Sequence, residues 1–528
     1  MDQNNRFVKL ITQPLFWVFG LAFFMRLFAC FATHIINPDG IHYIYQAQSI
    51  YYGKWDVLTS CHLNYVSPLP IFIVMAHTVF RDWVVAGQFV SFAFSFGALF
   101  PLYYLIKRFF EPTVTVLTLL VYALIPAFIN RSADVVRDPI FWFLLCSGML
   151  LFVRHFESPR GKFIFTDLLY SALLFLLAMW TRIEGVVFFV ASGAYLLCHV
   201  SQHKLKRLLS FFAPIVLILI VVGCTTLVVE DMDRFFLKRM GKIGTELTQF
   251  SQHYDQIRHQ LDITASQSSG MFQEFLREVH SVVWAVPLAM LFNAILDGFF
   301  YPNALLLLLG LSGLKAQRSR HAMQPYFIWI VIISLIVLYI HIIQIWMIFN
   351  RFMAIVIYPS FIFLGYGIEK CLTFFEDRYR IKYKTVILWM VLILVGFGLG
   401  KSLRPIHADK AVYPQIGKII AENKAPDKVA RIMGKQATIL NWIFFYAHRN
   451  YPEPLCAKNF ISNIPPTYTQ MLQTMKQEKI SFVLYEEKSW KEVEFNLMSQ
   501  PYRKDFDVLG QWHHKDTGDI MLMSLKNS

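Results

Sequence analysis

Charge and cysteine are both scarce in this chain. Charged side chains make up 16 % of the 528 residues against 56 % hydrophobic ones, and the seven cysteines are scattered without a CxxC pair. Such an apolar composition is typical of an integral membrane protein, and the cysteine pattern predicts neither a disulfide framework nor a zinc site. The sequence also lacks internal repeats and low-complexity stretches, which argues against a solenoid.

The last part of the sequence, residues 401–528, lacks a glycine-rich phosphate loop, a zinc motif and catalytic-triad spacing. It does contain two amphipathic helical patterns, at 411–424 and 468–479, and a run typical of a buried strand at 480–486. We therefore expect a small soluble α/β domain here, on the extracytoplasmic side.

The net charge of +14 would favour nucleic-acid binding in a soluble protein. Here the basic residues form short clusters between apolar runs, and such clusters keep loops in the cytoplasm. We therefore expect no nucleic-acid partner. Residues 1–400 are predicted to form a polytopic α-helical membrane domain with about 11 spans, a cytoplasmic N-terminus, outer loops at 37–82 and 230–280, and a cytoplasmic loop at 369–384.

One apolar run leaves the topology open. Residues 67–80 are short and proline-rich, so we expect an interfacial or re-entrant segment. If this run crosses the bilayer instead, the loops that follow change sides. The long loop at 230–280 contains amphipathic stretches, which predict one or two surface helices and a possible lid.

The stretch NPDGIHYIYQAQSIYYGKW directly follows the first apolar run and is polar. A helix that starts at Pro38 places Asp39 and Tyr43 on one face, because they are four residues apart. Asp39 is our first candidate catalytic residue. The alternative is that Asp39 only complements the positive end of the helix dipole.

Three further polar elements reach the same membrane boundary in this topology. They are the loop RSADVVRD, the turn TRIEG and the segment NRF, and their candidate residues are Asp134, Arg137, Asp138, Arg182, Glu184 and Arg351. Charges at the ends of apolar helices are costly unless they pair or bind a ligand.

Each of these candidates also has a purely structural interpretation. The two aspartates could pair locally with Arg131 and Arg137, Arg182 and Glu184 could close a hairpin, and Arg351 could reach the lipid headgroups. In the functional interpretation, a carboxylate acts as general base and an arginine holds a phosphate leaving group. That combination suits sugar transfer from a lipid phosphate.

The sequence resembles the GT-C polytopic glycosyltransferases, the group of protein O-mannosyltransferases and aminoarabinose-lipid A transferases. The resemblance rests on DGIHYIYQA, YGKW, DPIFWFLL, TRIEG and RFMAIVIYP, in this order, and on the C-terminal domain. It implies Asp39 as base, an assisting Asp138, Arg351 near the donor phosphate, a polyprenyl-phosphate-linked sugar donor, and neither cofactor nor catalytic metal. In one departure, Gly40 stands where many relatives have a second acid.

We therefore predict an inverting glycosyltransferase of a bacterial inner membrane, in contact with membrane lipids. Its acceptor would be a lipid such as lipid A, a surface glycan or a protein. Two other functions stay open: a transporter or flippase of lipid-linked glycans, and a scaffold that docks partners through residues 401–528.

Overall fold

A computed structural model gives the fold of the chain. It describes residues 13–58, 63, 65–157, 165–200, 202–226, 252–312, 322–424, 428–451, 453–455, 460–499 and 503–526. The chain forms two compact units. The helical unit comprises Met1–Leu27, Phe92–Ser132 and Arg137–Leu403, and the sheet unit comprises Phe28–Ser91, Ala133–Val136 and Arg404–Ser528.

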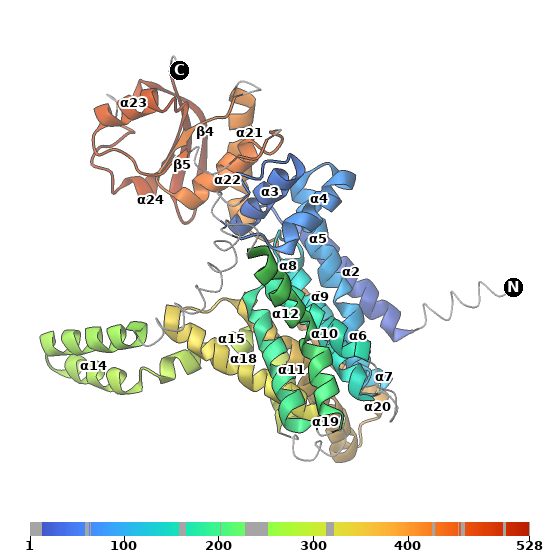
Figure 1. Ribbon diagram of the computed structural model, residues 1–528. Helices are drawn as coiled ribbons and strands as arrows, with labels where there is room; N and C mark the ends of the chain where they lie inside the picture. The colour runs from blue at the N-terminus through green and yellow to red at the C-terminus, as the bar shows by residue number, and fades with distance from the viewer. Residues whose placement is uncertain are drawn as a thin grey trace. The chain divides into compact units, whose positions relative to one another are not determined.

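The helical unit is a bundle of apolar helices (Figure 1). In the described part of the chain, six helical stretches are long and apolar enough to cross a bilayer, or up to eight if two bent helix pairs each count as one span. The six are α2 (Pro14–Ala32), α5 and α6 (Trp83–Gly97 and Leu99–Ile106), α9 (Asp138–Glu157), α18 (Gln324–Ile345), η2 and α19 (Asn350–Met353 and Ala354–Tyr379), and α20 (Tyr383–Ser402).

The other helices of this unit include shorter apolar ones and the 23-residue helix α12. They are α7 (Pro112–Leu124), α8 (Pro126–Ser132), α10 (Phe165–Thr181), α11 (Val186–His199), α12 (Lys204–Thr226), α15 (Ala285–Phe299) and α16 (Tyr301–Leu311). The prediction of a polytopic helical protein is confirmed. The count of about 11 spans stays a prediction, because it includes helices such as α10 and α11, which have 17 and 14 residues.

A buried arginine lies beside a break in this bundle. The axes of α7 and α8 differ by 58°, because Pro126 has no N–H to donate to the preceding turn. Arg26 of α2 is fully buried; its Nε donates to Ser95 Oγ at 2.9 Å, and its Nη1 lies 3.5 Å from the Ala123 carbonyl. The guanidinium thus supplies donors to backbone near the break, where helical bonds are missing.

Helix α19 is held against α16 by backbone contact. A Cβ atom at Gly310 would lie 1.9 Å from the Phe363 carbonyl oxygen, and one at Gly367 would lie 1.7 Å from that of Leu306. Small residues allow this approach between membrane helices. The packing fixes α19, whose first turn follows the NRF segment.

The predicted cytoplasmic loop at 369–384 is wrong in its extent. Helix α19 continues to Tyr379 and α20 begins at Tyr383, so only residues 380–382 connect them, with Arg380 in the left-handed conformation at φ 54°. The charged residues of 369–379 mark the point where the side chains meet solvent. They do not end the helix, because most of them are good helix formers.

Much of the predicted outer loop at 230–280 lies outside the described residues. Its described part contains a helix at 252–267 and α14 (Met271–Val282), so helices are present there, and their placement on the outer surface stays a prediction. The run at 67–80 forms the 13-residue helix α4 (Pro68–Phe80), which packs on α3 (Pro38–Tyr51) in the sheet unit. Its relation to a bilayer stays a prediction.

The C-terminal part of the sheet unit is the predicted α/β domain. Its sheet has the order β2-β1-β3-β5-β4, built from β1 (Ile432–Met433), β2 (Phe460–Ile461), β3 (Phe482–Glu486), β4 (Phe506–His514) and β5 (Gly518–Leu525). The β1 strand pairs in parallel with β2 and β3, and β5 pairs antiparallel with β3 and β4.

Helices cover both faces of this sheet (Figure 1). Met471 and Met475 of α23 (Tyr468–Gln477) pack with Val483 and Met523 in one core cluster. Helices α21 (Val412–Asn423) and α22 (Ala437–Ala447) lie on the other face, where Leu440 approaches Leu484. The strand at 480–486 and both amphipathic helices are confirmed.

The carboxyl group of Glu486 makes the stability of this sheet depend on pH. The side chain is fully buried, and burial raises the pKa of Glu486 from 4.5 to about 7. The folded state therefore holds its proton at pH values where the unfolded chain has lost it. The free energy of unfolding therefore has its full value, as far as Glu486 is concerned, below about pH 4.5. It falls by up to about 3 kcal/mol as the pH rises through 7.

We expect Glu486→Gln to remove this pH dependence. Hydrogen exchange of the β3 and β5 amides in the full chain, corrected for intrinsic rates, would measure it at pH 5 and pH 8. Wild-type protection should fall at pH 8, while protection in the variant should stay constant. An equal loss of protection in both proteins would contradict the assignment.

Candidate active site

The charged cluster of the helical unit is centred on Arg182. Its Nη1 donates to Asp138 Oδ1 at 2.9 Å and its Nη2 donates to Glu184 Oε1 at 2.7 Å. The Arg182 and Asp138 side chains are 2 % and 4 % exposed. The predicted ion pair of Arg182 and Glu184 is therefore present. Asp138 pairs with Arg182 as well.

The turn TRIEG positions this arginine. Helix α10 ends at Thr181, and residues Ile183–Gly185 form the 3₁₀ helix η1 before α11. Any side chain at residue 185 would lie 2.6 Å from the Met179 nitrogen, so only glycine fits against the last turn of α10. The turn was predicted from the sequence, but the close contact of Gly185 with the backbone of α10 was not.

Electrostatics keep the Glu184 carboxyl ionised. Burial alone would raise the pKa of Glu184, but Arg182, with Arg137 further away, outweighs burial and lowers the pKa below its usual value. Arg137 also donates from Nη1 to the Thr181 carbonyl at 3.1 Å. The residue before α9 is thereby tied to the end of α10.

The NRF segment brings aromatic rings and a second arginine to the helical unit's site. The Arg182 guanidinium lies 5.1 Å from the ring centre of Phe352, and that of Arg351 lies 5.4 Å from the same ring. Asn350, which precedes Arg351, donates its side-chain amide to Asp297 of α15. Arg182 and Arg351, which lie about 170 residues apart in sequence, therefore contact the same aromatic ring.

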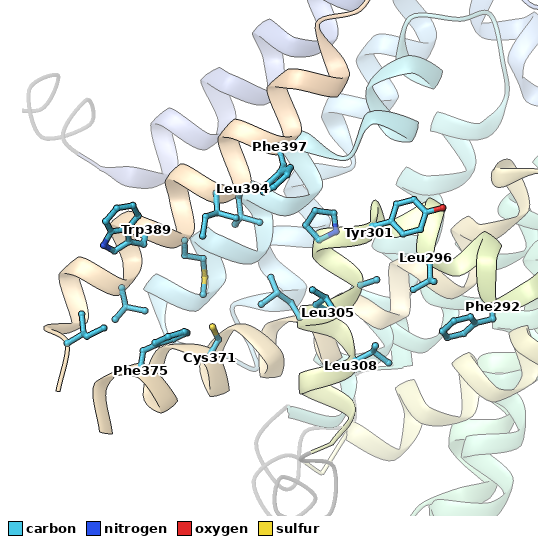
Figure 2. A pocket seen from close by; sticks show the side chains of 17 residues that line it. Phe292, Leu296, Tyr301, Leu305, Leu308, Cys371, Phe375, Trp389, Leu394 and Phe397 are labelled. Carbon is cyan, nitrogen blue, oxygen red and sulfur yellow. The ribbon is translucent and has the colours of Figure 1, made fainter. Parts of the chain in front are cut away.

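An apolar pocket of about 820 Å³ lies between α15, α16, α19 and α20. Figure 2 shows Leu305 of α16, Phe375 of α19, and Trp389 and Leu394 of α20 around this space. Leu296 also lines the pocket, and its neighbour Asp297 is the partner of Asn350. Helix α15 therefore links the pocket to the element that contains Arg351, and the volume of the pocket suits a large apolar ligand.

Asp39 lies in the sheet unit, in the first turn of α3. The Asn37 side chain accepts a hydrogen bond from the Asp39 N–H at 2.9 Å, and Pro38 is the first helical residue. Asp39 is half-buried, and Tyr43, one turn later, is buried. The predicted helix and its shared face are confirmed.

The loop with Asp134 supports this helix start. Asp134 Oδ1 accepts hydrogen bonds from the N–H groups of Asn37 at 2.7 Å and of Val135 at 2.9 Å. Val135 is buried between two glycines: a Cβ at Gly40 would lie 2.9 Å from its Cβ, and one at Gly87 would lie 2.7 Å from its Cγ1. Asp134 therefore holds the backbone that enters α3.

Sequence reasoning missed several residues around Asp39. Asn37 could have been found from the helix-start pattern of Asn before Pro. Trp442 donates from Nε1 to the Ile36 carbonyl at 2.9 Å, and the Tyr446 hydroxyl accepts from the Ile36 N–H at 3.2 Å. No local pattern indicates these contacts, because α22 lies about 400 residues later.

One group among the described side chains could hold a metal ion. The ligand atoms of Asp409, His514 and Asp516 lie within 4.8 Å of one another in the sheet unit. The Lys515 ammonium lies 3.4 Å from Asp409 Oδ2 and already offers this carboxylate a positive partner.

Comparison with known proteins shows that the chain has the fold of the GT-C membrane glycosyltransferases. ArnT from Cupriavidus metallidurans bound to undecaprenyl phosphate is 11 % identical, with a TM-score of 0.57 and 99 % of each chain covered. ArnT in the apo state gives a TM-score of 0.58, 11 % identity and coverage of 96 % of this chain and 97 % of the other.

A tethered complex of the Archaeoglobus fulgidus oligosaccharyltransferase with an acceptor peptide gives a TM-score of 0.51 at 11 % identity and covers 97 % of this chain and 74 % of the other. Residues 65–226 match the family model of the dolichyl-phosphate-mannose-protein mannosyltransferases. No curated protein matches the sequence. The fold expected from the sequence is confirmed by these structural similarities, and the apolar helices indicate a multi-pass membrane protein.

We expect Arg182→Gln to destabilise the protein strongly. The substitution leaves Asp138 and Glu184 as buried charges without their cation, which costs about 3–5 kcal/mol. Thermal unfolding in detergent would measure the loss, and the double variant Arg182→Gln/Asp138→Asn should recover part of it. An unchanged unfolding midpoint in the single variant would show that the ion pairs are not structurally important.

Proposed function

We propose that the chain is an inverting glycosyltransferase that moves a sugar from a polyprenyl-phosphate donor to an extracytoplasmic acceptor. The observation that carries the proposal is the hydrogen bond from Asn350, the residue before Arg351, to Asp297, whose neighbour Leu296 lines a large apolar pocket. A cation next to an apolar space matches a ligand with a phosphate head and a hydrocarbon tail. The undecaprenyl phosphate bound by the structurally similar ArnT supports the same donor class.

In this mechanism Asp39 is the general base. It takes the proton of the acceptor hydroxyl or amine while that oxygen or nitrogen forms a bond to the anomeric carbon of the sugar. The bond from this carbon to the phosphate oxygen breaks, and its electron pair leaves with the lipid phosphate. A single displacement of this kind inverts the configuration of the anomeric carbon.

Arg351 would stabilise the negative charge that develops on the departing phosphate. Arg182 already faces two carboxylates at 2.9 and 2.7 Å, so we assign it, with Asp138, Glu184 and Arg137, the task of positioning the site. Tyr43 and Asp134 would support Asp39, through the shared helix face and the bond to Asn37. No step in this scheme calls on a cofactor or a metal ion.

The orientation follows from the charge clusters. We place the protein in a bacterial inner membrane with residues 1–400 as the membrane domain and residues 401–528 as an extracytoplasmic domain. The acceptor, whether lipid, glycan or protein, would then reach Asp39 from the extracytoplasmic side of this membrane.

A transporter of lipid-linked glycans is the second candidate function. The bends of 58° between α7 and α8 and of 72° between α14 and α15 favour it, because transporters use discontinuous helices. A transporter would move labelled lipid across a vesicle membrane without transferring its sugar.

We expect Asp39→Asn to reduce sugar transfer by a factor of about 10²–10⁴, the usual contribution of a general base. Purified protein, radiolabelled polyprenyl-phosphate sugars and an outer-membrane lipid extract would provide the assay. Asp56→Asn, which changes an exposed acid of the same outer loop, is the matched control. Full transfer by Asp39→Asn would remove Asp39 from the mechanism.

We expect Leu305→Trp to raise the KM for a long-chain polyprenyl donor about tenfold, because the indole would occupy space that the tail needs. A short-chain analogue of the donor should be affected much less. Leu309→Trp, on the same helix but outside the pocket lining, serves as control. Equal effects of Leu305→Trp on both donors would place the tail elsewhere.

A further inference from the structure

A strongly basic groove of about 1470 Å³ lies at one end of the sheet. It is formed where β1, β3 and β4 begin, where β5 ends, and where α21 and α23 end. The groove is lined by seven basic side chains, Lys424, Lys428, Arg431, Lys476, Lys479, Lys504 and Lys526, and by one acidic side chain, Asp505.

Some of these groups already have protein partners. Arg431 pairs with Glu478 at 2.8 Å, and Lys526 lies 3.6 Å from Asp507. The carboxylate of Asp505 accepts a hydrogen bond from the Tyr468 hydroxyl at 2.6 Å. These contacts account for part of the charge and leave the groove with an excess of cations.

Four lysines provide this excess: Lys428, Lys476, Lys479 and Lys504. No carboxylate of the described residues lies within 4.0 Å of their ammonium groups. Lys476 is in the last turn of α23, where the helix dipole favours a cation. The other three follow helices or precede a strand, and no comparable local interaction explains them.

Lys479 occupies a position at which glycine is the usual residue. It follows the end of α23 with φ 52°, in the left-handed conformation that side chains rarely adopt. The Ile480 N–H then returns to the Met475 carbonyl at 2.8 Å and closes the helix end. A lysine at this position adds a cation to the groove.

We propose that this groove binds the phosphorylated saccharide part of the acceptor, an inference that rests on the proposed glycosyltransferase function. Lysine ammonium groups bind phosphate oxygens as point charges. Gln477, Ser481 and Ser524 also line the groove and can hydrogen-bond to sugar hydroxyls. The sheet unit that contains the groove also contains Asp39, so one unit would both hold the acceptor and deprotonate it.

An anionic membrane surface fits this groove less well. Proteins that insert into a lipid headgroup layer present large apolar side chains beside their cations. Between residues 404 and 526, the described side chains include no exposed large hydrophobic one. The groove is also concave, whereas a membrane surface is most easily met by a protruding face.

The test uses the full chain in nanodiscs of zwitterionic lipid and titrates it with a bis-phosphorylated glucosamine disaccharide. The variant Lys428→Glu/Lys479→Glu/Lys504→Glu should raise the Kd at least tenfold, and wild-type binding should weaken with salt. The control Lys418→Glu/Lys488→Glu/Lys491→Glu changes the net charge equally outside the groove and should alter the Kd less than twofold.

Three outcomes would overturn the proposal. The first is equal Kd values for the two triple variants, and the second is equal binding of the unphosphorylated disaccharide. The third is a loss of binding by the groove variant only to vesicles that contain anionic phospholipid, which would assign the groove to the membrane. Asp39→Asn separates this test from that of the catalytic proposal. It should bind the disaccharide normally and fail in transfer, whereas the groove variant should raise the KM for the acceptor at least tenfold.

Discussion

The salt bridges of Arg182 fix the charged end of the helical unit. One guanidinium joins the first residue of α9 to the turn after α10, and it stacks on a ring of the NRF segment. A cation in an apolar protein region is stable only if its donors are satisfied, so each of these elements depends on the others. The surroundings of Arg351 follow from this arrangement, because Phe352 contacts both arginines.

The sheet unit solves a different problem. Helix α3 buries apolar side chains such as Ile41 and Ile44, but the backbone at Ile36 just before it needs hydrogen-bond partners. Here α22 supplies the missing contacts through Trp442 and Tyr446, and Arg449 adds an ion pair with Asp82 at 2.7 Å. The C-terminal part of the chain therefore helps to stabilise the start of α3. Residues 28–91 and 404–528 therefore belong to one compact unit.

Local signals in the sequence predicted the helices, the α/β domain, the TRIEG turn and the start of α3. The spacing of apolar residues, the helix caps and the turn residues each depend on only a few neighbouring positions. The extent of α19 was missed because charge marks solvent and does not terminate a helix. The partners of Asp138 and Ile36 could not be predicted, since they are 44 and 406 residues distant in sequence. Long-range pairing of this kind depends on the packing of the whole bundle.

Gly40 follows the candidate base Asp39, and its packing against Val135 restricts which residues fit at this position. A side chain at residue 40 would meet both the Cβ and the carbonyl oxygen of Val135 at 2.9 Å. A larger residue at position 40 therefore requires a change in the loop that contains Val135. A homologue with a second acid after the first should carry a smaller residue at the position of Val135, or a longer loop there, and acceptor preference should change with this pair.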